Sequence, residues 1–279
     1  MPRFSGGSES PAHEPDQGFL LTRAEIAALV SLTGNKALRF VDGGIGLIGM
    51  SDDIALGLQS LVSRSLINID ISDRTKISLG EFLQDFFQIL NEREIAIEIR
   101  INSEDSAVQV SHWALQLKQR LAIVKSEVDG SSVKFWFALT DVRNKFRFIN
   151  AMSRPQESSC ESPPDQLASM SFDDYGRLFK ALRDRDAMQV DQILGGLPVD
   201  AASKSEFGRI VKEGFRGIEV TRQERHQNLL EAERFCWIES ERFGAWQVLL
   251  YPLEARVVFM TISNENLHAS FEAVTGQRL

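Results

Sequence analysis

The stretch from Ser78 to Ile101, SLGEFLQDFFQILNEREIAIEIRI, decides the fold class because two periodicities meet in it. In its first part, apolar side chains recur every three or four residues, which predicts an amphipathic helix over 79–90. The pattern from Ser78 to Glu81 at its start is typical of a capping box. From Ile95 to Ile101 every second residue is isoleucine, which predicts a half-buried strand.

Outward from this stretch, the first half of the chain reads as helices followed by a meander of strands. Upstream, a capping box at Thr22 to Glu25 predicts the start of a helix that runs to residue 33, and a second helix is predicted over 52–65. Downstream, Asp129-Gly130 predicts a hairpin turn, because this dipeptide favours tight turns between strands. The strand-like runs are 114–117, 121–127 and 133–140.

The same order of elements begins again after a stretch rich in proline and serine, 153–168, which we interpret as a linker. An amphipathic helix is predicted over 172–182, a shorter one ends at Leu194, and Ser203 to Glu206 predict the cap of a third. Strand-like runs follow at 218–221, 229–239, 245–251 and 255–263, and a last helix carries Leu267, Phe271 and Val274.

The sequence therefore predicts an α+β fold with two pseudo-repeated halves, each an antiparallel sheet flanked by helices. The expected organisation is a disordered tail over 1–18, an N-terminal half over 19–152, the linker over 153–168 and a C-terminal half over 169–279. Short links between the strands argue against parallel crossovers in either half.

Composition narrows the classes of function. The 279 residues include 31 basic and 39 acidic ones, which gives a net charge of −8 and argues against binding nucleic acid or an anionic membrane. Cys160 and Cys236 have no CxxC partner and favour free thiols in a reducing compartment. No apolar run approaches the ~20 residues that span a bilayer, and the start lacks the pattern of a signal peptide. We therefore expect a cytoplasmic protein, a monomer or a homodimer.

A glycine cluster offers the one motif with a known chemistry. Gly44, Gly46 and Gly49 match the G-x-G-x-x-G spacing of dinucleotide-binding loops. Asp52 and Asp53 oppose that interpretation, because they would place negative charge where a pyrophosphate binds. The alternatives are a nucleotide-dependent enzyme and a plain loop between two helices.

No other pattern indicates catalysis or metal binding. The histidines have no ligand spacing, and no nucleophile or phosphate-loop motif occurs. We therefore expect no catalytic, metal-binding or cofactor-binding residues and a function that is not enzymatic. The four histidines are His13, His112, His226 and His268.

Three strand-like runs of the second half are apolar at successive positions, so each is apolar on both faces. These runs are Phe235 to Ile238, Val248 to Tyr251 and Val257 to Met260. Such strands are either covered on both sides, for example by helices of the first half, or they expose apolar surface to a partner. The predicted partner-binding residues are Trp237, Trp246, Val248, Leu250, Val258 and Met260.

The order of these elements resembles the EspG family, the cytosolic chaperones associated with ESX (type VII) secretion. The resemblance rests on Leu38 to Val41, the glycine-bearing loop, the helix that ends at Leu61 to Ile67, the helix Leu79 to Leu90 and the strand Glu94 to Ile101. It implies a pseudo-twofold α+β fold. It also implies a non-enzymatic chaperone or adaptor that holds an aggregation-prone, helical secretion substrate.

Overall fold

One continuous antiparallel sheet dominates the fold. The computed structural model describes residues 18–33, 51–70, 77–103, 108–129, 132–153, 166–183, 186–198, 200–213, 215–226, 229–240 and 244–276. In the order of the sheet, the strands of these ranges are β1 (Gly18–Thr22), β7 (Ser132–Asp141), β6 (Arg120–Asp129), β5 (Val108–Leu117), β4 (Ile95–Ser103), β9 (Arg216–His226), β10 (Leu229–Ser240), β11 (Gly244–Tyr251), β12 (Arg256–Thr261) and β8 (Gln166–Ser171). β2 (Ile67–Ile69) and β3 (Ile77–Leu79) form a separate pair.

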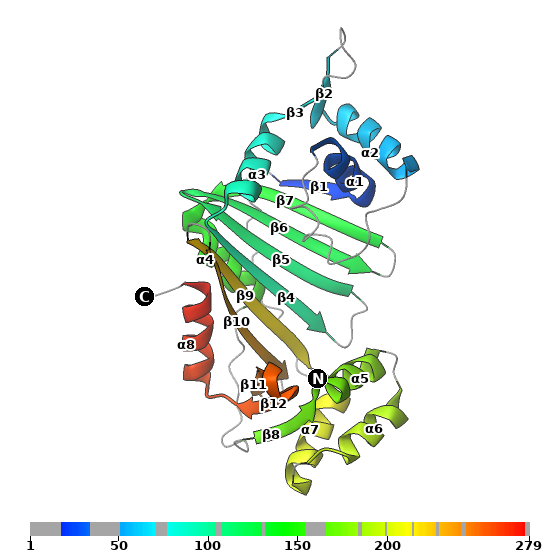
Figure 1. Cartoon of the computed structure of the whole chain (residues 1–279), viewed down its shortest axis with the longest axis vertical. Helices are drawn as coiled ribbons and strands as arrows, with labels where there is room; N and C mark the ends of the chain where they lie inside the picture. Colours follow the sequence, from blue (N-terminus) through cyan, green and yellow to red (C-terminus); the bar gives the residue numbers. More distant parts are fainter. Residues whose placement is uncertain are drawn as a thin grey trace, which may run out of the picture.

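The two halves of the chain have the same topology. In the first half, β1 leads through helices into the meander β4 to β7 and then pairs with β7 at the outer edge. In the second half, β8 leads through helices into β9 to β12 and pairs with β12. The inner strands β4 and β9 pair with each other, so the two half-sheets become one. The predicted α+β class with two related halves is confirmed, and the joining of their sheets is a finding of the structure (Figure 1).

Helices cover both faces of this sheet. Residues opposite each other in an antiparallel pair point to the same face, so Ala96 of β4 shares a face with Leu115 and Gln223. We call this the front face, and the face that carries Ile97 and Ile99 the back face. The helices are α1 (Arg23–Thr33), α2 (Ser51–Ser63), α3 (Glu81–Glu92), α4 (Lys145–Ser153), α5 (Phe172–Arg183), α6 (Ala187–Gly195), α7 (Ala201–Glu213) and α8 (Asn264–Thr275).

Three hydrophobic clusters hold these layers together. Helices α1 to α3 pack on the front face of the first half, where Phe86 of α3 meets Phe137 of β7 edge to face at 4.8 Å. Helices α5 to α7 pack on the front face of the second half, where Phe207 lies 4.8 Å from Phe259. Helices α4 and α8 pack on the back face, over the strands next to the joint between the halves.

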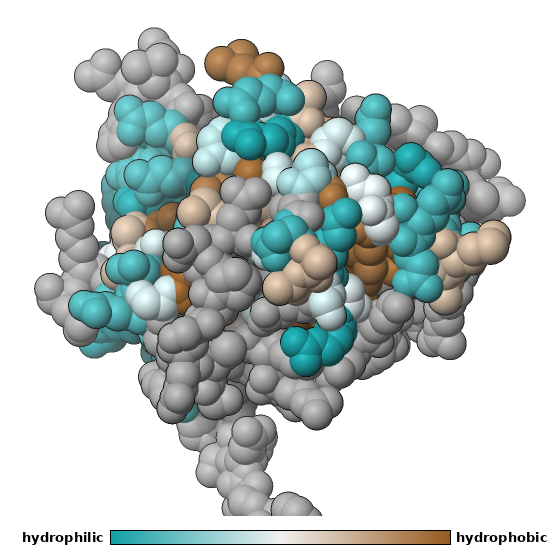
Figure 2. Space-filling model, turned by 90° about the horizontal axis from the view of Figure 1, so that it is seen from below, coloured by the Kyte–Doolittle hydropathy of each residue, from teal (hydrophilic) through white to brown (hydrophobic). Residues whose placement is uncertain are grey.

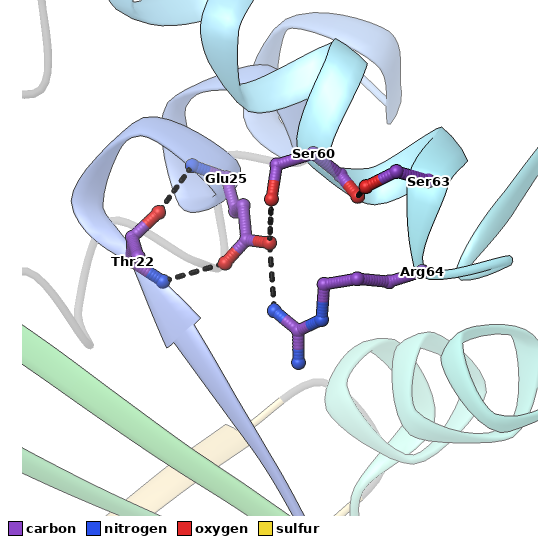
Figure 3. A network of polar contacts seen from close by, with 5 residues as sticks. All are labelled: Thr22, Glu25, Ser60, Ser63 and Arg64. Carbon is purple, nitrogen blue, oxygen red and sulfur yellow. Dashed lines mark hydrogen bonds and ion pairs between the residues drawn. The ribbon is translucent and has the colours of Figure 1, made fainter.

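The capping box predicted at Thr22 is confirmed and continues into a larger network (Figure 3). The Thr22 amide donates to Glu25 Oε2 at 2.8 Å, and the Glu25 amide donates to Thr22 Oγ1 at 3.2 Å. The buried Glu25 carboxylate also accepts hydrogen bonds from Ser60 Oγ and Arg64 Nη1 of the next helical segment, both at 2.7 Å. One side chain thus starts α1 and fastens it to α2.

Two other predicted caps are wrong. No side-chain hydrogen bond caps α3, because Ser78 belongs to β3 and Gly80 takes the cap position. At α7 the cap is Asp200, whose Oδ1 accepts from the Ser203 amide at 2.9 Å. At α7 the predicted cap residue, Ser203, lies inside the helix, which begins two residues earlier.

The meander strands and their turns agree with the alternating pattern. Strands β4 to β7 and β9 to β12 lie over the predicted runs, although β5 begins at Val108, well before the run 114–117. Asp129 pairs with Ser132 across the predicted hairpin. The sequence did not predict β1, β8, the β2–β3 pair or α4. In the stretch expected as a linker, Ser153 ends α4 and Gln166 begins β8, while 154–165 lie outside the described residues. The predicted domain limits stay predictions.

Candidate protein-binding surface

The six predicted partner-binding residues do not make one open surface. Trp237 and Trp246 are 1% and 0% exposed, and Val248 and Val258 are buried as well. The expectation of exposed apolar strands does not hold for these four side chains. Leu250 is 39% exposed on the front face and Met260 is half-buried on the back face. A binding role for these residues stays a prediction.

Their burial has a simple cause, which the run from Phe235 to Ile238 illustrates. On the back face, Trp237 packs against Phe271 of α8 with ring centroids 6.0 Å apart. On the front face, Ile238 belongs to the cluster under α5 to α7. The second half therefore places its own helices on both faces of β10, and the back-face cluster that contains Trp237 also includes Ile149 of α4 in the first half.

The centre of the front face is different, because it is polar and lies between the two helical groups. Figure 1 shows β4 and β9 running between the group α1 to α3 and the group α5 to α7. We define the central strip as the front-face residues of β4, β9 and β10 between the apolar clusters. Its members are Glu98, Arg100, Glu219, Thr221, Gln223 and Arg234.

The charges of the central strip are paired. Arg100 Nε lies 2.8 Å from Glu98 Oε1, and Arg234 Nε lies 3.1 Å from Glu219 Oε1. The side chains of Arg100 and Arg234 are 42% and 53% exposed, so water reaches both pairs. The strip is thus electrically balanced and solvated, and its exposed ion pairs add little to folding stability.

Two side chains at the second-half border of the central strip, Cys236 and Tyr175, stay protonated at neutral pH. Cys236 lies opposite Glu219 in the β9–β10 ladder. Burial, and then the charge of Glu219, raises the pKa of the Cys236 thiol to about 12. Burial, and then Cys236 and Glu219, raises the pKa of Tyr175 to about 12. Because thiolates and not thiols attack substrates, this cysteine is no nucleophile at neutral pH.

In the described part of the chain, no three His, Cys, Asp or Glu side chains gather as a metal site would require. None of the described helices is long and apolar enough to cross a membrane. The loop with Gly44, Gly46 and Gly49 lies outside the described residues, so the dinucleotide hypothesis stays untested.

Comparison with known proteins gives a likeness of structure only. No family model and no curated protein matches the sequence. Among solved structures, the chain is similar to one of the Mycobacterium tuberculosis type VII secretion system chaperone EspG5 in complex with a PE25-PPE41 dimer. The sequence identity is 6%, the match covers 92% of this chain and 95% of that chain, and the TM-score is 0.48.

The sequence did not predict the burial of Trp237, Trp246, Val248 and Val258, for a definable reason. Apolar runs report how many faces of a strand are covered, and they do not report what covers them. The central strip had a weaker signal, since Glu98 and Arg100 are the polar members of the alternating strand. Only the pairing of β4 with β9 brings them beside Glu219.

Proposed function

We propose that this chain is a non-enzymatic cytoplasmic chaperone or adaptor that holds a helical protein partner across the central strip. The observation that carries the proposal is the gap in the helical cover of the front face. The apolar cluster of α1 to α3 reaches Ala96 of β4 and that of α5 to α7 reaches Ile238 of β10, and the central strip between them carries ion-paired side chains. The front face is open to water here at Arg100 and Arg234, whose side chains are 42% and 53% exposed.

A protein partner fits the central strip better than a small ligand does. Sites for small molecules are concave and mostly apolar, whereas the central strip is open and charged. A helix that lies along the central strip can contact the helices on either side of it. Arg100 and Arg234 are partly exposed, so they can exchange their present partners for acidic side chains of a helix at low cost in desolvation.

The class of partner in this proposal comes from the resemblance of the sequence to the EspG family. By that resemblance the partner is a helical type VII secretion substrate that aggregates when it is alone. Holding such a substrate in soluble form requires contact and no chemistry, which agrees with the protonated Cys236 at the border of the strip.

The test places a photo-crosslinking amino acid at Gln223 in the central strip and, as a matched control, at Arg147 on α4 of the back face. Each variant is produced in the native host together with tagged helical ESX substrates. We expect a crosslink to one substrate from Gln223 and none from Arg147. Equal crosslinking from both positions, or none from either, would contradict the proposal.

Charge reversal tests the same surface without crosslinking. Arg234→Glu leaves two carboxylates facing each other at Glu219, so binding of the substrate identified above should weaken about tenfold. The control Arg147→Glu makes the same change in net charge on the back face and should leave the affinity unchanged. Equal loss in both variants would point to net charge and not to the central strip.

A further inference from the structure

A second binding feature lies at the free edge of the sheet, away from the central strip. β8 is an outer strand, and no other strand among the described residues pairs with its far side. Natural proteins usually protect such edges with charged residues or proline. β8 has the sequence QLASMS and contains neither. Its outer side is therefore competent to pair with another strand.

The ladder shows which backbone groups face outward. Ser171 lies opposite Arg256, and the Phe172 amide donates to the Ala255 carbonyl at 2.9 Å, one step further along. Bonded and non-bonded positions alternate in an antiparallel pair, so Met170 bonds inward to β12. The amides of Ser169 and Ser171 then point to the open side.

A pocket of about 490 Å³ adjoins the end of β8, between that strand, the end of α6 and the turn before β12. Three successive residues of β8, Ser169 to Ser171, line it together with Ala255 and Arg256. Since side chains of a strand alternate between its faces, a pocket that touches all three reaches both faces of β8 near its end. Its apolar wall comes from Met170, Ile193 and Leu197, which are all buried.

The rim of this pocket is electrically neutral and partly apolar. Asp174 is paired with Arg177 at 3.3 Å and Glu254 with Arg256 at 2.8 Å, so neither sign of charge is in excess. The side chains of Phe172 and Leu253, beside the pocket in sequence, are exposed. Figure 2 views this end of the molecule and shows apolar side chains at its surface between hydrophilic ones.

We propose that β8 binds an extended peptide segment of a partner protein, which adds a strand to the sheet and places one uncharged, apolar side chain in this pocket. The backbone of the peptide bonds to the outward amides of Ser169 and Ser171, as in other cases of strand addition. The neutral rim selects against a charged side chain at this position, because that charge would lose water without gaining a partner. This site does not depend on the helical partner of the central strip.

The test uses a fluorescent peptide of residues 254–261, a sequence that already forms a strand beside β8. We expect it to bind the full chain and to protect the amides of Ser169 and Ser171 from hydrogen exchange. A peptide of the same composition in scrambled order should neither bind nor protect. Absence of binding by the ordered peptide, or protection elsewhere only, would overturn the proposal.

Two variants separate strand addition from replacement of β12 by the peptide. Ser169→Pro removes an outward amide that β12 does not use, so the fold should persist while peptide affinity falls at least about tenfold. Binding that survives Ser169→Pro means that the peptide displaces β12 or binds elsewhere, and it would overturn the proposal.

Adjacent glycines give a matched pair if the proline variant fails to fold. Gly196 lines the pocket and has room for a Cβ, whose nearest neighbour would be the Ile193 carbonyl oxygen at 3.5 Å. Gly195 lines a different hollow and has no atom within 4 Å of an added Cβ. Gly196→Leu should abolish peptide binding and Gly195→Leu should leave it intact. The same affinity in both variants would count against the pocket.

Discussion

At the scale of the residue, the buried side chains of Glu25 and His112 differ in whether they carry a charge. Burial raises the pKa of Glu25, but hydrogen bonds from Thr22, Ser60 and Arg64 outweigh burial and hold that pKa below its usual value. His112, buried on the back face against Phe148, has no comparable donors. Burial, and then the charge of Lys125, lowers the pKa of His112 to about 4. Glu25 is therefore buried charged, and His112 is buried neutral.

Replacing Glu25 tests the charged case. Glu25→Gln keeps the size of the side chain but leaves Arg64 without its carboxylate. The amide has only one oxygen, so its NH2 group faces a donor, either the Thr22 amide or Ser60 and Arg64. We expect a loss of about 1–3 kcal/mol in the free energy of unfolding, measured by urea titration. The control Glu92→Gln lies on the exposed end of α3 and should change stability by less than about 0.5 kcal/mol. Equal stability of the two variants would mean that the network is dispensable.

His112 makes stability depend on pH in a defined window. The unfolded chain binds a proton at His112 near pH 6.5, and the folded chain does so only near pH 4. The stability contributed by the neutral side chain is therefore present above pH 6.5 and is lost as the pH falls toward 4, by up to about 3 kcal/mol.

The measurement compares urea unfolding of the wild type and of His112→Gln at pH 7 and pH 5. The wild type should lose more stability than the variant over this interval, because Gln cannot titrate. Carboxylates that titrate below this window act equally on both proteins and cancel in the difference. Parallel losses in the two proteins would show that His112 takes up its proton without cost.

At the scale of the element, close backbone approach decides where a small residue is required. Helices α1 and α2 cross at Gly57, where an added Cβ would lie 2.1 Å from the Ala24 carbonyl oxygen. No side chain fits there unless the helices separate. Sequence alone gave no hint of this, since a glycine inside a helix usually weakens it.

Two glycine variants with opposite outcomes test this crossing. Gly57→Ala should destabilise the protein by about 1–3 kcal/mol, because overpacking exceeds the gain in helix propensity. The matched change Gly176→Ala, in α5 where nothing lies within 4 Å of the added Cβ, should stabilise it by about 0.5–1 kcal/mol. Stabilisation by both changes, measured by thermal unfolding, would mean that α1 and α2 separate without cost.

At the scale of the whole molecule, the two halves share a core. Ile99 of β4 lies opposite Val220 of β9, and both belong to the back-face cluster that also contains Phe235 and Phe271. Neither half buries this cluster by itself. We therefore expect the halves to unfold together although their topologies are separate.

Tryptophan fluorescence can follow each half on its own, because β5 and β7 carry Trp113 and Trp136 while β10 and β11 carry Trp237 and Trp246. Two variants with the tryptophans of one half changed to Phe each report on the other half. We expect the urea midpoint by fluorescence to equal the midpoint by circular dichroism within each variant. Two separated transitions in one variant would show that the halves are independent domains.

The sequence by itself determined the α+β class, the meander strands and most helices, because these depend on periodicities that a few neighbouring residues carry. The alternation from Ile95 to Ile101 requires one buried face whatever lies against it. The sequence also determined the cap at Thr22, whose partner Glu25 is three residues away. These features depend on local geometry.

Only the tertiary structure decided the pairing of β4 with β9, the place of β8 at the sheet edge and the surfaces left open. The strand β8 has no charge and little periodicity, so its identity depends on β12, far along the chain. The sequence suggested that Trp237 and Trp246 are exposed to a partner, because the apolar pattern of a strand does not show which helices cover it. The central strip exists because Arg100 and Glu219, distant in sequence, lie opposite each other where the two half-sheets join. No local sequence pattern contains this long-range pairing.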